Sequence, residues 1–354
     1  MVNRRSFLAA MAMASLAPSL ATPAPSNRIR IGQIGTSHAH ASGKMQAIRS
    51  LPNLYEVVGI AEPIQNRQHT PQNQPPYDDL RWMTEDALLS DKSIEALVIE
   101  TTLQDSPRAA RAAIHAGKHL HLDKPGAASH AEFTALRLEA QQRSLTLQMG
   151  YMLRYNPAFQ LLFRAHREGW LGQITEIDAS MGKLADATLR TELLHYPGQG
   201  MFELACHLVD AIVFLLGKPL AVHAFNQNTG LAHDQLNDNQ MAVLEYSRTT
   251  VTIRCNHGDP FGSPHRRFQV VGTKGAMEIQ PLESGQVTLH LTDEKENYKK
   301  GENHIRLTLP PGRYNGEFID FARALQNHQP LAWSAEHDIL THATALRCAG
   351  IDPD

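Results

Sequence analysis

Three ionisable residues stand in an otherwise apolar stretch, Met201 to Leu216. Glu203, His207 and Asp210 follow one another at intervals of four and three residues. In a helix this spacing puts all three side chains on one face. A helix that is apolar all round is buried, and buried ionisable groups need partners or a wet cavity. We therefore treat the three as candidate active-site residues, with a purely structural network around His207 as the alternative.

A second chemical feature is Asp123-Lys124-Pro125. It follows the alternating stretch Lys118 to Leu122, which predicts a half-buried strand. The strand thus ends at a lysine amine beside a rigid proline ring. A third feature, Gly150 to Pro157, contains Tyr151 and Arg154.

The elements around Lys124 form a regular series. Strands are expected at 28–34, 55–61 and 96–99, and helices at 41–51, 84–90 and from Ser106, where Pro107 suits a first helical turn. Alternating strands and helices predict a doubly wound parallel sheet of the Rossmann type.

The first turn of this series is Gly35-Thr36-Ser37-His38-Ala39-His40. Against the dinucleotide pattern G-x-G-x-x-G, Gly35 fills the first place, Ser37 the second and His40 the third. Ser37 is small and can donate its hydroxyl to a phosphate. Glu62, at the end of the second strand, is a candidate for the ribose hydroxyls. A plain structural turn is the alternative.

From about residue 150 the pattern changes to long strands with few helices between them. Strands are expected at 174–181, 240–246, 250–256, 267–271, 276–279, 287–291 and 305–309, and helices at 156–168, 201–216, 314–325 and 335–349. This predicts an α+β domain with a large, mostly antiparallel sheet. The fold class is α/β, with residues 27–149 as the nucleotide-binding domain and 150–354 as the substrate-binding and oligomerisation domain.

Residues 1–26 have the features of an export signal. Arg4-Arg5-Ser6-Phe7-Leu8 is followed by a short apolar run and small residues, which resembles a twin-arginine signal. The run is shorter than the roughly 20 residues of a membrane-spanning helix. We expect passage through the twin-arginine machinery, a periplasmic or exported location, and no membrane attachment after signal removal. A Sec signal or an uncleaved lipid-facing tail is the alternative.

Composition excludes other classes. The formal net charge of −3, without a cationic run, argues against a nucleic-acid partner. Three cysteines and no Cys-x-x-Cys pair give no disulfide framework. The pairs His38/His40 and His119/His121 can chelate, but a metal site needs three or four converging ligands, so we predict no metal.

Taken together, Lys124-Pro125, the Glu203/His207 helix, Gly150 to Pro157 and the hairpin Gly272-Thr273-Lys274-Gly275 resemble the glucose-fructose oxidoreductase and inositol dehydrogenase family, Gfo/Idh/MocA. The resemblance covers the whole mature chain. It implies an oxidoreductase with His207 as general base, since the unperturbed pKa of histidine, near 6.5, suits proton transfer near neutral pH. Glu203 would orient that imidazole and favour its protonated form, and Lys124 would stabilise alkoxide charge.

The resemblance also assigns further residues. It places the cofactor at Gly35, Thr36, Ser37, His38, Glu62, Thr101 and Lys124, and the substrate, a sugar, cyclitol or derivative, at Tyr151, Arg154 and Asp210. NAD is favoured over NADP because Glu62 would repel a 2′-phosphate. A homo-oligomer built on the large sheet is expected.

Two other functions stay open. One is a redox-neutral enzyme that uses bound NAD transiently in hydrolysis or elimination. The other is a non-catalytic sugar-binding protein on a decayed dinucleotide fold, suggested by the missing fingerprint glycines.

Overall fold

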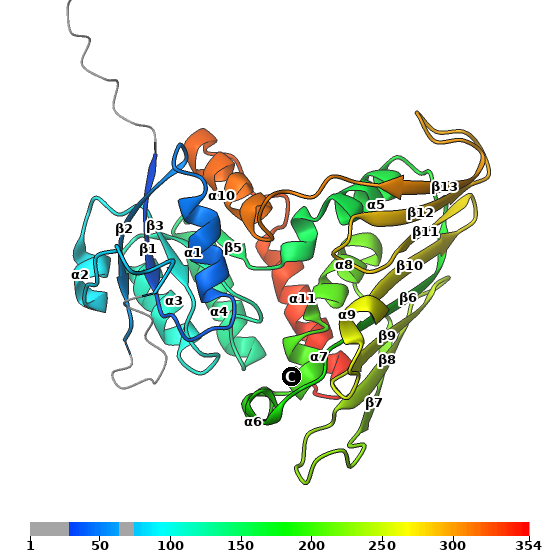
Figure 1. Ribbon diagram of the computed structural model, residues 1–354, viewed down its shortest axis with the longest axis horizontal. Helices are drawn as coiled ribbons and strands as arrows, with labels where there is room; N and C mark the ends of the chain where they lie inside the picture. The colour runs from blue at the N-terminus through cyan, green and yellow to red at the C-terminus, as the bar shows by residue number, and fades with distance from the viewer. Residues whose placement is uncertain (1–27, 64–73, 354) are drawn as a thin grey trace, which may run out of the picture.

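The computed structural model describes residues 28–63 and 74–353, and the expected export signal lies outside them. Figure 1 shows two sheets with a layer of helices between them. Within the described ranges, no helix is long and apolar enough to cross a membrane.

The first sheet is parallel and five-stranded, in the order β2-β1-β3-β4-β5. Its elements are β1 (Ile29–Ile34), α1 (Ala41–Arg49), β2 (Tyr55–Ala61), α2 (Glu85–Ser90), β3 (Ala96–Ile99), α3 (Ser106–His115), β4 (His119–Leu122), α4 (His130–Gln142) and β5 (Leu147–Met149). The predicted Rossmann-type sheet is confirmed.

Local chemistry explains several of these boundaries. Thr84 caps α2 by accepting a hydrogen bond from the backbone N–H of Ala87. Pro107 occupies the first turn of α3, whose N-cap is Asp105, one residue before the predicted start. Gly117 follows the end of α3 with a positive φ of 72°, which glycine adopts without strain.

The second sheet has eight strands in the order β13-β12-β11-β10-β6-β9-β8-β7. All neighbours are antiparallel except β6 and β9, as predicted for a mostly antiparallel sheet. The strands are β6 (Ile174–Gly182), β7 (Ala221–Gln227), β8 (Asn239–Glu245), β9 (Thr250–Asn256), β10 (Arg267–Gly272), β11 (Gly275–Ile279), β12 (Gln286–Leu291) and β13 (Gly301–Arg306).

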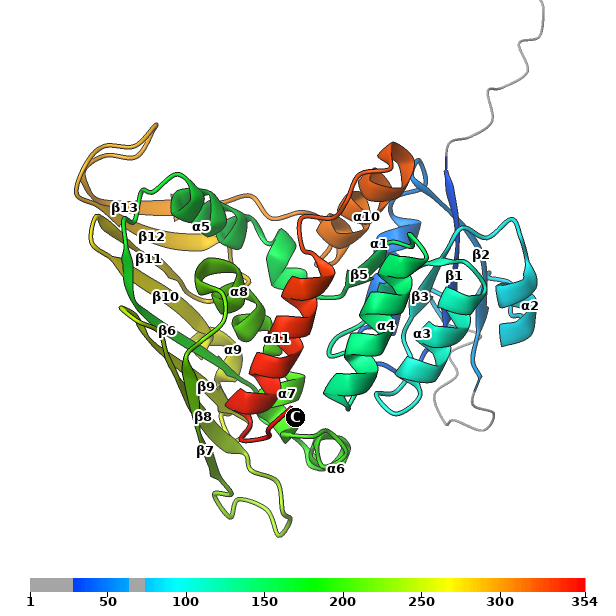
Figure 2. The same cartoon turned by 180° about the vertical axis from the view of Figure 1, so that it is seen from behind.

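The helices of the second half are η1 (Met152–Tyr155), α5 (Pro157–Arg167), α6 (Ala187–Leu193), α7 (Gln199–Glu203), α8 (Cys206–Leu216), α9 (Gly262–His265), α10 (Asn315–Asn327) and α11 (Ala335–Cys348). Figures 1 and 2 show α5, α7, α8 and α11 on the side of the large sheet that faces the first domain. Its other side carries no helix among the described residues.

Two sequence expectations need correction. Strand β7 was not predicted, because Ala221–Gln227 mixes alanine with histidine, asparagine and glutamine and shows no clear apolar alternation. The last strand is Gly301–Arg306, four residues earlier than expected, and its exposed position at the sheet edge demands few apolar residues.

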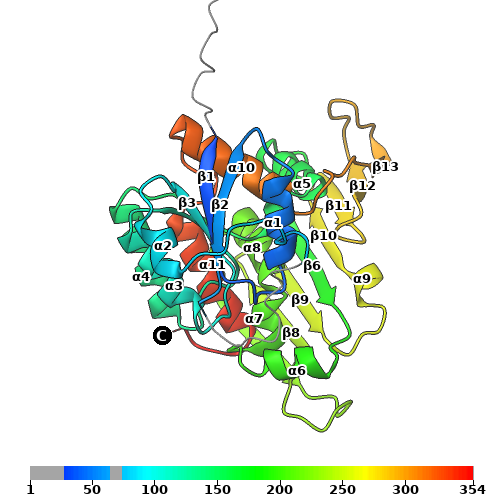
Figure 3. The same ribbon diagram turned by 60° about the vertical axis from the view of Figure 1, so that its left-hand side comes forward.

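Helix α10 returns to the first domain, although its sequence lies within the second. The Tyr55 hydroxyl donates to the carbonyl of Phe318 at 2.5 Å, and the Asn315 amide donates to Ser50 Oγ at 3.0 Å. Figure 3 shows α10 beside α1 and β1. Residues 315–327 therefore pack on the nucleotide-binding domain as well as on η1 of the second domain.

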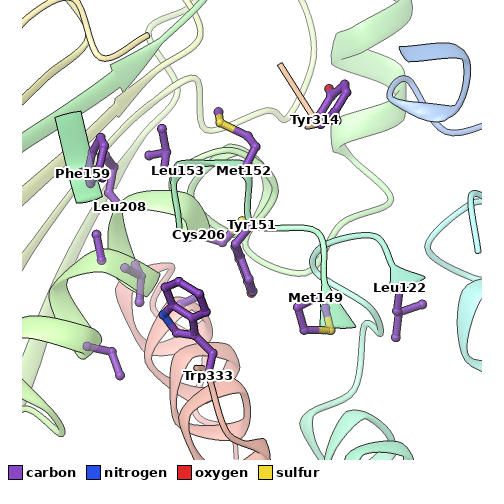
Figure 4. Packing of buried hydrophobic residues seen from close by; sticks show 14 of the residues in the cluster. Leu122, Met149, Tyr151, Met152, Leu153, Phe159, Cys206, Leu208, Tyr314 and Trp333 are labelled. Carbon is purple, nitrogen blue, oxygen red and sulfur yellow. The ribbon is translucent and has the colours of Figure 1, made fainter. Parts of the chain in front are cut away.

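The core is continuous across the two domains. Figure 4 shows Leu122 and Met149 of the first domain, Phe159 and Leu208 of the second, and Tyr151 between them. This packing joins the end of β4 to α8. It therefore brings Asp123-Lys124-Pro125 close to the helices that carry Glu203 and His207.

Candidate active site at the domain junction

Lys124 and Glu203 form a buried ion pair between the domains. Lys124 Nζ donates to Glu203 Oε1 at 2.7 Å and to the Glu203 carbonyl at 2.8 Å, and its side chain is 1% exposed. Burial disfavours the charge of Lys124, but the Glu203 carboxylate outweighs it and raises the pKa of the lysine above its usual value. Lys124 is thus a fixed cation at the end of β4.

Glu203 and His207 do not share one helix, which corrects the prediction of a continuous helix over 201–216. Helix α7 ends at Glu203 and α8 begins at Cys206. At the break, the N–H groups of Leu204 and Ala205 both point to the Gly200 carbonyl, at 2.8 and 3.4 Å. The Glu203 carbonyl accepts from Lys124 Nζ and from Cys206 Sγ.

His207 is buried beside Lys124, and its Nδ1 has no hydrogen-bond partner among the described residues. Its ring meets that of Tyr151 edge-on, with centroids 5.8 Å apart. Burial, and then the Lys124 cation, hold the pKa of His207 well below its usual value. The expectation that Glu203 orients the imidazole and favours its protonated form is not met, because Glu203 bonds Lys124 and burial favours the neutral form of His207.

The first loop adopts the tight turn that a dinucleotide site requires. Gly35 has a φ of 87°, and a Cβ there would lie 2.6 Å from Thr101 Cγ2. Thr36 donates its N–H and its hydroxyl to Glu62 Oε2, at 2.8 and 2.9 Å. Ser37 Oγ is buried with no hydrogen-bond partner in the described chain. The structure brings these five residues together.

A group of buried charges below this loop was not predicted. Asp123 Oδ2 lies 2.8 Å from His38 Nδ1 and 2.9 Å from His40 Nδ1. Lys44 Nζ lies 3.1 Å from Asp123 Oδ1 and 3.3 Å from Glu100 Oε1. Lys44 and Glu100 are fully buried. A lysine among the apolar positions of 41–51 was the sequence signal for this group.

These charges perturb one another. Burial would lower the pKa of His38, but Asp123 and Glu100 raise it to about 9. The pKa of His40 falls to about 3, because burial outweighs its contact with Asp123. Burial alone would raise the pKa of Asp123, and His38, Lys44 and His40 hold it well below its usual value.

Arg154 and Asp210 are engaged with each other. Arg154 Nε and an Nη donate to the two Asp210 oxygens at 2.9 and 2.6 Å, and that Nη also donates to Asp338 Oδ1 at 2.5 Å. His337 Nε2 lies 2.9 Å from Asp210 Oδ1. Arg154 and Asp210 are each 2% exposed, and the ring of Tyr151, the third predicted substrate residue, lies 4.7 Å from the guanidinium and 5.8 Å from the His207 ring. Their contact with substrate stays a prediction.

A narrow pocket connects the first loop to Lys124. It is lined by His38, Ile99, Thr101, Leu103, Ser106, Asp123, Lys124, Pro125, Gly126 and Tyr196. Three residues assigned to the cofactor from sequence, His38, Thr101 and Lys124, therefore share one pocket. Tyr196, which precedes α7, was not singled out in the sequence.

Comparison with known proteins identifies the family. Residues 29–151 match an oxidoreductase family described as having an NAD-binding Rossmann fold, and residues 159–278 match the GFO/IDH/MocA C-terminal domain. The chain belongs to the Gfo/Idh/MocA oxidoreductase family. Its predicted two-part architecture is thereby confirmed.

Two of the similar relatives are named for carbohydrate-like compounds. The chain is 23% identical over 269 residues to inositol 2-dehydrogenase of Salmonella typhimurium, covering 73% of this chain and 74% of that one. It is 23% identical over 272 residues to 1,5-anhydro-D-fructose reductase of Ensifer adhaerens, covering 73% and 78%.

Solved Gfo/Idh/MocA-like structures share the fold. A levoglucosan dehydrogenase in complex with NADH and levoglucosan superimposes with a TM-score of 0.77 at 16% identity, covering 91% of this chain and 97% of that one. UDP-N-acetylglucosamine 3-dehydrogenase from Acidithiobacillus ferrooxidans gives 0.75 at 20% identity, covering 92% and 98%.

Proposed function

We propose that this oxidoreductase transfers hydride between NAD and a secondary alcohol of a sugar, cyclitol or related compound. The observation that carries the proposal is the proximity of the Lys124 cation to the His207 imidazole. A buried cation, held by Glu203, lies close enough to lower the pKa of a neutral imidazole whose Nδ1 has no partner in the described chain. A base and a cation together suit the oxidation of a hydroxyl group.

Three residues of the chain have separate roles in the proposed reaction. His207 accepts the proton of the substrate hydroxyl, because its imidazole is neutral near pH 7. Lys124 stabilises the negative charge that develops on that oxygen, and Glu203 keeps the ammonium group in place. Acceptance of the hydride is the chemistry that the nicotinamide supplies when bound.

The first loop fits a dinucleotide despite its two missing glycines. Gly35 makes the required turn, and the buried Ser37 hydroxyl has no partner in the described chain and suits a phosphate oxygen. Glu62 sits against this turn through Thr36. A carboxylate there favours the ribose hydroxyls of NAD over the 2′-phosphate of NADP.

The cofactor is tested first, by mass spectrometry of small molecules released when the purified protein is denatured. NAD at one equivalent supports the proposal. If no nucleotide is released and none is taken up on titration, the non-catalytic sugar-binding alternative replaces it.

Turnover is tested with NAD and a panel that includes inositol and levoglucosan, following NADH absorbance. Lys124→Met and His207→Asn are expected to lower kcat by about 100-fold or more. Lys274→Met and His290→Asn, at exposed positions of the second domain, are the controls. Unchanged turnover in the first pair would refute the assigned roles, and product without net NADH would indicate redox-neutral chemistry.

Export is proposed on sequence alone. Residues 1–26 fused to a folded fluorescent reporter are expected to carry it to the periplasm, and Arg4→Lys with Arg5→Lys is expected to block this. Retention of the unaltered fusion in the cytoplasm would refute the signal.

A further inference from the structure

We propose that His38, His40 and Asp123 form a binding site for a divalent transition-metal ion. Within the described chain, the ligand atoms of these residues all lie within 4.8 Å of one another. Each pair of neighbouring ligands in a tetrahedral zinc site is about 3.3 Å apart when the metal bonds are about 2.0 Å long. Separations of 2.8 and 2.9 Å from Asp123 Oδ2 need only small movements to reach that geometry.

The two oxygens of Asp123 have different surroundings, which suits a carboxylate that binds a metal through one oxygen. Oδ1 accepts from the backbone N–H of Lys124 at 2.7 Å and lies 3.1 Å from Lys44 Nζ. Oδ2 faces the two imidazoles. Protein groups thus fix the carboxylate from behind and direct one oxygen to the histidines, as outer-shell contacts do in metal sites.

Glu100 supplies a second, independent indication. It is fully buried, and neither of its oxygens has a hydrogen-bond partner among the described residues, although Lys44 Nζ lies 3.3 Å away. Glu100 Oε2 is 3.6 Å from His38 Nδ1. Lys44 approaches Oε1, whereas Oε2 faces His38, so a metal ion there would offset the cost of burying that oxygen. Glu100 can act as a fourth ligand or as an outer-shell acceptor.

The charge around the site also favours a cation. Three buried carboxylates, Asp123, Glu100 and Glu317, surround the single lysine Lys44. Lys124 is already paired with Glu203. A divalent ion bound by the two imidazoles would displace the His38 proton and place its own positive charge beside Asp123 and Glu100.

The ligands belong to chain segments that converge at one sheet edge. His38 and His40 follow β1, Glu100 follows β3 and Asp123 follows β4. The sequence alone offered only the His38/His40 pair, because Asp123 is more than 80 residues away in the chain. Two imidazoles with a carboxylate suit zinc, iron, cobalt or manganese.

The test measures metal directly and without nucleotide, so it is independent of the proposed redox function. The mature protein is freed of metal with a chelator and titrated with Co²⁺, followed by visible absorption, and with Zn²⁺, followed by calorimetry. We expect one equivalent of each ion and the intense visible bands of a low-symmetry cobalt site. The absence of both signals would overturn the proposal.

Variants locate the ion. His38→Asn and His40→Asn are each expected to weaken Zn²⁺ binding at least tenfold, whereas His130→Asn is the matched control. His130 also lies beside a second histidine, His342, with their Nδ1 atoms 3.3 Å apart, but belongs to a different part of the first domain. Equal Zn²⁺ affinity in all three variants would overturn the assignment.

A ligand-retaining variant guards against simple misfolding. His40→Cys keeps a donor atom at the same position, so it is expected to bind Co²⁺ and to add a near-ultraviolet thiolate-to-cobalt band. Circular dichroism of the metal-free variants establishes that they are folded. A folded His40→Cys protein that binds Co²⁺ without this band would place the ion elsewhere.

Discussion

At the scale of single residues, the contact between Glu203 and Lys124 decides how the site works. The sequence position of Glu203 suggested that it orients the general base, His207. In the structure Glu203 bonds Lys124 instead. Its carboxylate and its carbonyl both accept from Lys124 Nζ. In the proposed mechanism, Glu203 therefore positions the cation that stabilises charge on the substrate oxygen.

This role predicts a specific kinetic change. Glu203→Gln is expected to lower kcat by roughly tenfold or more while the KM of the alcohol changes little, because charge stabilisation matters most in the transition state. Glu203→Asp keeps a carboxylate and is expected to recover most of the loss. Steady-state kinetics with NADH detection measures both. A rise in KM alone would instead make Glu203 a substrate-binding residue.

At the scale of elements, the sequence predicts what local periodicity determines. Both sheets and most helices follow from apolar patterns and from turn residues such as Pro107 and Gly117. The break between α7 and α8 does not, because Met201 to Leu216 is uniformly helical in pattern. The break places the Glu203 carbonyl against Lys124, a residue 79 positions earlier.

The sequence likewise predicts part of the candidate site but not all of it. Glu203 and His207 could be selected because they lie in an apolar stretch, and Lys124 because it follows a predicted strand. Lys44 alone was marked by its place among apolar positions, and its grouping with Glu100 and Asp123 could not be predicted, since only the folded sheet brings the three elements together. Contacts between residues that lie far apart in the sequence leave no periodic pattern from which they could be predicted.

The network that joins η1, α8 and α11 yields a prediction about stability. Asp210→Asn is expected to lower the free energy of unfolding by about 3 kcal/mol, because it leaves part of the buried Arg154 charge unpaired. The control is Asp79→Asn, which breaks an exposed ion pair with Arg49 and is expected to lower the free energy of unfolding far less, because solvent screens such a pair. Urea unfolding measures both. A stable Asp210→Asn protein with a raised KM would support the predicted substrate contact instead.

At the scale of the whole molecule, His342 couples domain packing to pH. It lies on α11, stacks on Phe133 of α4 with ring centroids 4.5 Å apart, and its Nε2 lies 2.9 Å from the Ala127 carbonyl. Burial, with a smaller effect of nearby His130, lowers the pKa of His342 to about 4, although the hydrogen bond to the Ala127 carbonyl opposes this shift.

Because the unfolded state takes up this proton at a higher pH than the folded state, stability falls as pH falls from about 6.5 to about 4. Over this interval the protonation of His342 lowers the free energy of unfolding by up to about 3 kcal/mol. His342→Gln keeps a donor for Ala127 and is expected to reduce the pH dependence of unfolding by up to one proton in this interval. Urea melts at several pH values measure the slope. An unchanged slope would show that His342 is not buried in its neutral form.

The large sheet leads to the last prediction, that the protein associates through the face without helices. On β7, Ala224 and Asn226 face α11, since a Cβ on Gly350 would lie 3.5 Å from Ala224 and Asn226 donates to the Ala349 carbonyl. Phe225 therefore points to the opposite face, where it is 52% exposed and pairs with Met241 of β8.

An aromatic side chain exposed on a broad sheet suits contact between identical subunits. Light scattering of the mature protein is expected to give a multiple of the monomer mass, and Phe225→Lys is expected to shift it toward the monomer. Phe261→Lys is the matched control, because Phe261 is 67% exposed but lies in the segment before α9 and not on that strand face. A monomeric wild-type protein would contradict the prediction, whereas equal masses for all three proteins would place the interface away from Phe225.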